Sequence, residues 1–243
     1  IAKEDVTLEE AIENIDIGGP TMIRSAAKNN NDVAVVVDPS DYEELLAEMK
    51  VGNGGLTKTQ KLKLAYKAFH HTAEYDQRIQ KYLGEIVLDE EEKQELPETL
   101  LDRYDKREDL RYGENPHQQA AFYLEAEQNE PSISTAEQLH GKGMSYNNIN
   151  DTDGALELVK EFESKPAAAV IKHANPCGMA EADSLKKAFV NAHAGDPLSA
   201  FGSIVAVNRK IDAETAVEIA DQDKFIKVVI ARDYEAEALE ILK

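Results

Sequence analysis

Short apolar runs that alternate with amphipathic helical segments constrain this chain to an α/β fold. Continuous runs of β-branched or small apolar residues predict buried strands, and they occupy residues 33–37, 166–171, 203–207 and 225–231. The run at 33–37 is typical of a buried parallel strand. Strands that alternate with helices along a chain predict layered sheets and the α/β class.

The helical segments carry start signals. Thr7-Leu8-Glu9-Glu10 has the pattern of a capping box, and Thr57 begins a long amphipathic segment. We expect that helix to end near Ala73, where a further helix continues to residue 83. Other helices are expected over 20–28, 41–49, 153–162, 184–194, 213–220 and 235–243. Shorter strands are expected over 120–124 and 137–139.

A charged stretch divides the chain. Residues 88–109 contain the run DEEEKQE and Pro97, which indicates a linker or a domain edge. Neither end of the chain has the features of a natural terminus, because Ile1 is not an initiator Met and a helical pattern continues to Lys243. We therefore expect a fragment of a longer protein.

The charge balance excludes several classes of protein. The formal net charge is −20, which opposes binding to nucleic acid or to anionic membranes. No apolar run reaches the length of a membrane span, the charged first residues lack the apolar region of a signal peptide, and the one cysteine, Cys177, excludes an internal disulfide. These features predict a cytoplasmic protein in which any anion-binding site collects Lys, Arg and backbone N–H groups locally.

Lys172-His173 directly follows the apolar run at 166–171, and a turn-rich segment follows at 175–178. The end of a strand in an α/β sheet is a common ligand site. A histidine can transfer protons near neutral pH, and a lysine adds positive charge. The pair is therefore a candidate for catalysis, although a surface lysine beside a satisfied core histidine fits the same spacing.

Two further segments are candidates for ligand recognition. Arg111-Tyr112 precedes a loop rich in Asn, His and Gln. The Arg can bind a phosphate through two hydrogen bonds, and the Tyr can stack on a base. Asp16 precedes Gly18-Gly19 at a helix start, where free N–H groups can hold an anion or a carbonyl oxygen. By themselves, the two patterns are explained more simply by an ordinary polar turn and by a glycine-containing helix junction.

The cluster of Asn147, Asn148, Asn150 and Asp151 has two interpretations. Its amides can recognise a heterocycle, or Asn150 or Asp151 can cap the helix that follows. The sequence contains no HExxH or CxxC motif, so no metal is predicted. It also lacks a Walker A and a GxGxxG motif, which opposes a P-loop ATPase and a dinucleotide fold.

Five segments together resemble one family of bifunctional enzymes of purine biosynthesis. In this family, phosphoribosylaminoimidazolecarboxamide (AICAR) formyltransferase is joined to inosine monophosphate (IMP) cyclohydrolase. The segments are IDIGGPTMIRSAAKN (15–29), LRYGENPHQQAAFY (110–123), GKGMSYNNINDTDGALELVKEF (141–162), AVIKHANPCG (169–178) and SAFGSIVAVN (199–208). They cover nearly the whole chain in order, and they match the middle of such a protein.

The resemblance implies two domains. Residues 1–105 are similar to the end of a methylglyoxal-synthase-like α/β cyclohydrolase domain plus a linker. Residues 106–243 are similar to the start of a cytidine-deaminase-like α/β formyltransferase domain.

The implied first reaction transfers a formyl group from the cosubstrate 10-formyltetrahydrofolate to AICAR ribonucleotide. By position, Lys172 and His173 match the family's catalytic pair, and Arg111 and Tyr112 match its nucleotide-binding pair. Three more residues are assigned to the same pocket: His117, Asn148 and Gly202. Cys177 has no implied role, because formyl transfer needs no covalent enzyme intermediate.

The implied second reaction closes the ring of formyl-AICAR ribonucleotide to give IMP. Asp16 and Lys28 match the catalytic positions of the cyclohydrolase, and backbone N–H groups of Ile17, Gly18 and Gly19 are expected to hold the base. The resemblance also implies a homodimer. The match at 225–234 departs from the family's pattern at Lys227, whose role is therefore in doubt.

Further parts of both domains are expected outside these 243 residues, so we expect little activity from this chain alone. Two other functions remain open from the residues themselves. The chain can be a non-catalytic purine-nucleotide-binding module, or an acidic interaction domain.

Overall fold

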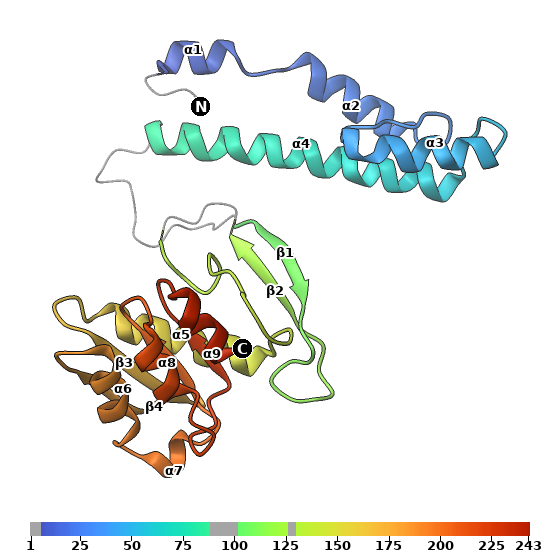
Figure 1. Ribbon diagram of the computed structural model, residues 1–243. Helices are drawn as coiled ribbons and strands as arrows, with labels where there is room; N and C mark the ends of the chain where they lie inside the picture. The colour runs from blue at the N-terminus through green and yellow to red at the C-terminus, as the bar shows by residue number, and fades with distance from the viewer. Residues whose placement is uncertain (1–5, 88–101, 126–129) are drawn as a thin grey trace. The chain divides into compact units, whose positions relative to one another are not determined.

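The computed structural model describes residues 6–87, 102–125 and 130–243, and the chain divides into two compact units, Ile1–Leu101 and Asp102–Lys243 (Figure 1). The predicted domain boundary at residue 105 falls inside strand β1 of the second unit. The charge run DEEEKQE of the predicted linker lies outside the described residues. Among the described residues, no helix is both long and apolar enough to cross a membrane.

The first unit is helical in its described part, 6–87. Its elements are α1 (Leu8–Glu13), α2 (Gly18–Lys28), the 3₁₀ helix η1 (Pro39–Asp41), α3 (Tyr42–Val51) and α4 (Lys58–Val87). The predicted capping box is confirmed, with Thr7 and Glu10 bonded reciprocally. Thr57 caps α4 in the same way, since its hydroxyl accepts from Gln60 N at 3.3 Å.

Two predictions for this unit are wrong. The helix that starts after Thr57 continues past Ala73 as the single helix α4. The predicted strand at 33–37 is coil without a ladder, and Val33 is 38% exposed. A strand needs a neighbour to satisfy its N–H and C=O groups, and no strand is present among residues 6–87. Val35 and Val37 instead pack against the small core that α2 and α4 share.

The second unit contains a four-stranded mixed sheet with the order β4-β3-β5-β6. The strands are β3 (Ala167–Lys172), β4 (Asn175–Glu181), β5 (Ile204–Val207) and β6 (Val228–Ile230). β3 pairs antiparallel with both neighbours, and β5 pairs parallel with β6. The predicted strands at 166–171 and 203–207 are confirmed, whereas of the predicted strand at 225–231 only Val228–Ile230 are paired.

Helices cover both faces of this sheet, so the unit has three layers (Figure 1). Alternate residues of a strand point to opposite faces. Ala167, Ala169 and Ile171 of β3 therefore pack against α5 (Tyr146–Lys160), while Ala168 and Val170 belong to the opposite core. That second core is covered by α6 (Leu185–His193), α7 (Pro197–Ala200), α8 (Ala213–Ile219) and α9 (Ala236–Leu242).

A separate antiparallel pair precedes the sheet in the chain. It consists of β1 (Tyr104–Asp109) and β2 (Ala121–Glu125). The prediction of a strand at 120–124 is confirmed. Of the two predictions for 88–109, a linker is wrong for 104–109, which form the first strand at the edge of the second unit. Every residue of β1 is exposed, so the strand carries no apolar pattern. The predicted strand at 137–139 is absent, because this segment is coil.

Candidate active site

The turn between β3 and β4 presents the candidate pair Lys172-His173. Lys172 pairs with Asn175 across the hairpin, so His173 and Ala174 alone connect the two strands. Both have positive φ, 55° and 57°, as a type I′ hairpin turn requires. The predicted turn at 175–178 is therefore wrong: the turn lies two residues earlier, and residues 175–181 form β4.

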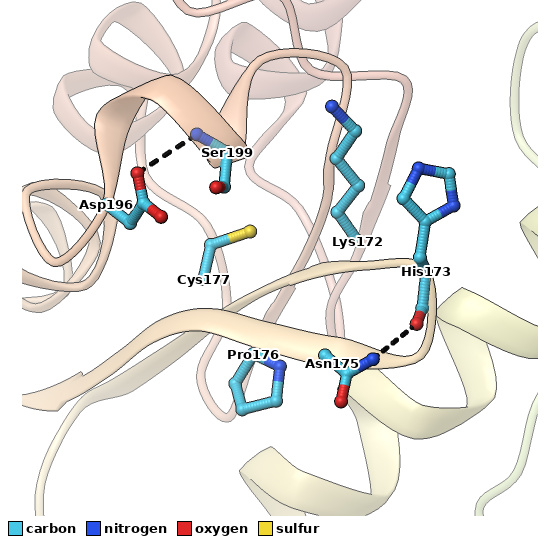
Figure 2. A pocket seen from close by; sticks show the side chains of 7 residues that line it. All are labelled: Lys172, His173, Asn175, Pro176, Cys177, Asp196 and Ser199. Carbon is cyan, nitrogen blue, oxygen red and sulfur yellow. Dashed lines mark hydrogen bonds between the residues drawn. The ribbon is translucent and has the colours of Figure 1, made fainter.

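Three hydrogen bonds hold this turn. The carboxylate of Asp151, on α5, accepts from His173 N at 3.2 Å and from Ala174 N at 2.7 Å. The side-chain amide of Asn175 donates to the His173 carbonyl at 2.7 Å, as Figure 2 shows. The conformation of the turn is thus tied both to its own strand and to a neighbouring helix.

An open pocket of about 290 Å³ lies beside the hairpin. Its lining residues are Lys172, His173, Asn175, Pro176, Cys177, Asp196 and Ser199 (Figure 2). A β-bulge at Cys177 shifts the register of β4 between its pairs with Val170 and Ile171. A bulge redirects the side chains around it, and the Cys177 thiol faces the pocket.

The ionisation of two lining groups follows from their surroundings. Burial raises the pKa of the Cys177 thiol, with the charge of Asp196 as the next cause, so the thiol stays protonated at neutral pH and is a poor nucleophile. Asp196 caps α7 by accepting from Ser199 N at 3.0 Å, and hydrogen bonding from the side chain and the backbone N–H of Ser199 lowers the pKa of the Asp196 carboxyl. The pocket therefore contains a fixed carboxylate opposite the cation of Lys172.

Lys172 also connects the hairpin to Gly202. Its ammonium donates to the Phe201 carbonyl at 2.8 Å, immediately before Gly202. Gly202 has φ +80° and is bonded through its N–H to Phe225 O. A Cβ placed on Gly202 would lie 3.4 Å from Cε and 3.7 Å from Nζ of Lys227, so two lysines flank the Phe201–Gly202 peptide.

The loop that contains Arg111, Tyr112 and His117 connects β1 to β2. Its Arg111 guanidinium lies over the Tyr112 ring at 5.7 Å. The loop contacts the start of α5: Tyr146 N donates to Tyr112 O at 3.5 Å, and the Asn147 side chain donates to Glu114 O at 3.1 Å. The first turns of α5 therefore contact both this loop and the hairpin.

Asn148 lies between those two contacts on α5. Ser145 caps the helix by accepting from Asn148 N, so the prediction of a cap at Asn150 or Asp151 is wrong. The structure thus brings Tyr112, Asn148 and the Lys172-His173 pair to the start of α5 and the β3–β4 hairpin, and the bond of Lys172 to Phe201 O connects Gly202 to them. His117 is exposed in the loop.

The candidates of the first unit lie apart from one another. Asp16 accepts from Gly19 N at 2.9 Å and caps α2, and its own N–H donates to the Tyr75 hydroxyl at 2.8 Å. Lys28 is in the last turn of the same helix. Lys28 is ten residue steps after Gly18 along the helix, which is about 15 Å at 1.5 Å per residue. The structure does not bring Asp16 and Lys28 together.

Sequence reasoning missed two residues of this region and the role of a third, Asp151, which it considered only as a helix cap or as part of a polar cluster. Asp196 and Ser199 line the pocket, and Asp151 holds the hairpin turn. Asp-Pro-x-Ser is a helix-start pattern with Pro at the first helical position, so Asp196 was recognisable as a cap. Nothing local to Asp151 indicates its bond to residues 173 and 174. Among the described residues, no group of three or more His, Cys, Asp or Glu side chains is arranged to hold a metal ion.

Comparison with known proteins decides the family. The model of the AICARFT/IMPCHase bienzyme family matches residues 26–243. The chain belongs to the AICARFT/IMPCHase bienzyme family. It is also 53% identical over 242 residues to the bifunctional purine biosynthesis protein PurH of Acetivibrio thermocellus. That alignment covers all of this chain and 46% of the relative, so the chain spans about half of the relative's length.

The AICARFT/IMPCHase match includes most of the candidate residues. Lys28 and all candidates of the second unit lie within residues 26–243. Asp16, Ile17, Gly18 and Gly19 precede the match, although the alignment with the Acetivibrio protein spans the whole chain. The mixed α/β architecture of the second unit is therefore that of a segment of an AICARFT/IMPCHase protein.

Proposed function

We propose that this chain is part of a bifunctional enzyme that transfers a formyl group to AICAR ribonucleotide and closes the product to IMP. The observation that carries the proposal is the placement of Lys172 and His173 at the hairpin beside an open pocket, in a chain of this family. The unit Asp102–Lys243 then belongs to a cytidine-deaminase-like formyltransferase domain. The unit Ile1–Leu101 belongs to a methylglyoxal-synthase-like cyclohydrolase domain, and we place the domain boundary near residues 101–105.

His173 is proposed as the base for formyl transfer. The attacking amine of AICAR ribonucleotide is a weak nucleophile, because its lone pair is delocalised into the imidazole ring. Removal of its proton while the new C–N bond forms suits an exposed histidine at the pocket edge. The formyl carbon then separates from the folate nitrogen, which leaves with a proton as tetrahydrofolate.

Lys172 is proposed to stabilise the charge that develops on the formyl oxygen or to deliver the proton to the leaving nitrogen. Its bond to Phe201 O holds the ammonium at the pocket. Both substrates are anionic, whereas the formal net charge of the chain is −20. Lys172 and Lys227 beside Gly202, together with Arg111 on its loop, give the local positive charge that such substrates need.

Nucleotide recognition is assigned to the loop and the start of α5. Arg111 and Tyr112 are proposed to bind the nucleotide, with His117, Asn148 and Gly202 in the same pocket. The shared contacts of α5 with the loop and with the hairpin support one continuous site. The cosubstrate 10-formyltetrahydrofolate, a homodimeric assembly and a cytoplasmic location complete the proposal.

For ring closure we propose Asp16, Lys28 and the N–H groups of residues 17–19. Gly19 N–H already donates to Asp16, so the cap orients the carboxylate at the start of α2. Asp16 and Lys28 lie at opposite ends of α2, so their action in one reaction is a prediction that the structure of this unit does not itself suggest. Loss of cyclohydrolase activity in both Asp16→Ala and Lys28→Ala of the full-length protein is the result that we expect.

The decisive experiment measures formyl transfer and nucleotide affinity in the full-length protein. His173→Ala should abolish formyl transfer while the affinity for AICAR ribonucleotide stays within about threefold, since the base contributes to the transition state. His71→Ala, exposed on α4, is the matched control and should be active. Unchanged transfer in His173→Ala would contradict the proposal. Nucleotide binding by a wild-type protein that transfers no formyl group would favour a non-catalytic module.

The 243-residue chain itself should transfer formyl groups slowly or not at all. It spans only 46% of the relative's length, and the proposed site requires groups beyond it. Transfer by this chain at the rate of the full-length enzyme would show that the described pocket is sufficient.

A further inference from the structure

The hairpin turn that carries His173 adopts a conformation that its residues disfavour. A type I′ turn needs positive φ at both central positions, and Asn-Gly or Gly-Gly are the usual residues there. Here the positions are His173 and Ala174, with φ 55° and 57°. A Cβ makes this region costly, so the turn persists only where surrounding contacts impose it.

Asp151 supplies the contact that imposes this conformation from outside the hairpin. Each of its two carboxylate oxygens accepts one of the two N–H groups of the turn, at 3.2 and 2.7 Å. Hydrogen bonds to an ionised carboxylate are stronger than those between neutral groups. Both bonds require the two N–H groups to point the same way, toward α5.

The helix that carries Asp151 is a rigid support. Ser145 caps α5 at its start. Further along the same helix, Ala155 and Val159 are buried against β3 and β5. The side chain of Asp151 is half-buried and does not belong to the pocket lining. Its bonds are to backbone N–H groups, so it acts on the imidazole only through the turn.

We propose that Asp151 is a positioning residue for formyl transfer, which holds the strained turn so that the His173 imidazole stays at the pocket. The proposal rests on the proposed function of the Lys172-His173 pair. It adds a residue that contacts neither substrate, and it explains why a turn without glycine is stable at this place. Without Asp151, the turn relaxes and the base leaves its position.

Kinetics of full-length variants test the proposal. Asp151→Ala should lower kcat for formyl transfer by about 100-fold, the effect of a misplacement near 1 Å. The KM for AICAR ribonucleotide should stay within about threefold of the wild-type value, because the Arg111 loop is held elsewhere on α5. Asp153→Ala, on the same helix and similarly half-buried, is the matched control and should keep the wild-type kcat.

A second substitution separates positioning from a general loss of structure. Glycine adopts positive φ without strain. Ala174→Gly alone should therefore leave kcat within about twofold of wild type, and in the Asp151→Ala background it should restore kcat by about tenfold or more. If Asp151→Ala does not fold, Asp151→Asn serves instead, since it keeps one acceptor oxygen and should lower kcat by about tenfold.

Amide exchange at His173 and Ala174 gives a readout that does not depend on activity. The Asp151→Ala variant should lose the protection of both amides by at least about tenfold, and Asp153→Ala should keep it. A kcat within threefold of wild type in Asp151→Ala, no recovery on adding Ala174→Gly, or unchanged exchange would each overturn the proposal. A wild-type enzyme without formyl transfer would overturn the proposed function instead, and the exchange of the two amides would still decide whether Asp151 holds the turn.

Discussion

Gly178 of β4 lies so close to α6 that no side chain fits. A Cβ built on Gly178 would be 1.9 Å from the carbonyl oxygen of Ala192, which is backbone and cannot move aside. Gly178→Ala should therefore lower the free energy of unfolding by at least about 2 kcal/mol, through displacement of the strand or the helix. Urea denaturation followed by circular dichroism measures the change.

Gly154→Ala is the matched control for this substitution. Gly154 is an exposed position of α5 where a Cβ would meet nothing within 4 Å. Glycine inside a helix costs about 0.5 to 1 kcal/mol relative to alanine, so this variant should be more stable than wild type. Equal effects of the two alanine substitutions would show that the close approach of β4 to α6 is not present in solution.

His193, at the end of α6, should make stability depend on pH. Burial is the main cause that lowers the pKa of His193 from 6.5, and the charge of Lys224 adds to it. The unfolded chain then binds the proton more tightly than the folded chain. Neutral His193 therefore makes its full contribution to the free energy of unfolding above about pH 6.5, the pKa in the unfolded chain. This contribution is lost as the pH falls through the lower pKa that His193 has in the folded chain.

Unfolding free energies between pH 5 and pH 8 test this prediction. His193→Gln should reduce the loss of stability on acidification relative to wild type, because a neutral side chain cannot take up the proton. His140→Gln, at an exposed position of the same unit, is the control and should follow the wild-type curve. If His193→Gln and the wild type had the same dependence of unfolding free energy on pH, the prediction would be contradicted.

Among the elements, the coil segment 33–37 should be less protected than the helices of the first unit. No strand is present among residues 6–87, so the N–H groups from 34 to 37 lack a ladder. Hydrogen exchange of these amides should be faster than that of Val170 or Val205 by on the order of 100-fold or more. Ala65 and Ala68, buried in α4, provide the comparison within the same unit. Protection of 34–37 equal to that of β5 would show a paired strand.

The elements that the sequence predicts are those with a one-sided or fully buried apolar pattern. The helices α1, α2, α6 and α8 and the strands β3 and β5 carry such patterns, and the structure contains them near the expected bounds. β1 is exposed along its whole length, so no alternation marks it. β4 follows a turn without glycine or asparagine, which removes the usual hairpin signal.

The candidate site was predictable only where its residues are adjacent in the sequence or lie in a motif. Lys172 and His173 follow an apolar strand, and that position indicates a ligand site. The bond from Lys172 to Phe201 O, which connects the pair to Gly202, depends on how β3 and α7 pack. The same holds for Asp151, whose contact with the turn spans 22 residues of chain.

At the scale of the whole molecule, the two units differ in how much apolar surface they bury. Within residues 6–87, the buried apolar side chains are mostly alanines, together with one leucine: Ala11, Ala27, Leu64, Ala65 and Ala68. Larger apolar groups of these helices, such as Met22 and Tyr66, are about 70% exposed. The second unit buries both faces of its sheet, with Phe189, Ile204 and Ile211 fully enclosed.

This difference predicts different stabilities for the two units when each is produced alone. Each buried CH₂ group stabilises the folded state by about 0.8 kcal/mol, and alanine has only one side-chain carbon. A core of alanines therefore offsets little of the conformational entropy that is lost when the helices become ordered. A protein of residues 102–243 should unfold in one cooperative transition with a free energy of several kcal/mol. A protein of residues 1–101 should show partial helicity that decreases gradually on heating.

Circular dichroism melting and urea titration of the two proteins and of the whole chain measure this. The cooperative transition of the whole chain should match that of 102–243 in midpoint and in urea dependence, since the m-value follows the surface exposed on unfolding. A single, sharper transition of the whole chain at a higher midpoint would show that the first unit depends on the second for its fold. A cooperative transition in residues 1–101 alone would show that the contacts of α2 with α4 are sufficient, although their core consists of Ala27, Ala65 and Ala68.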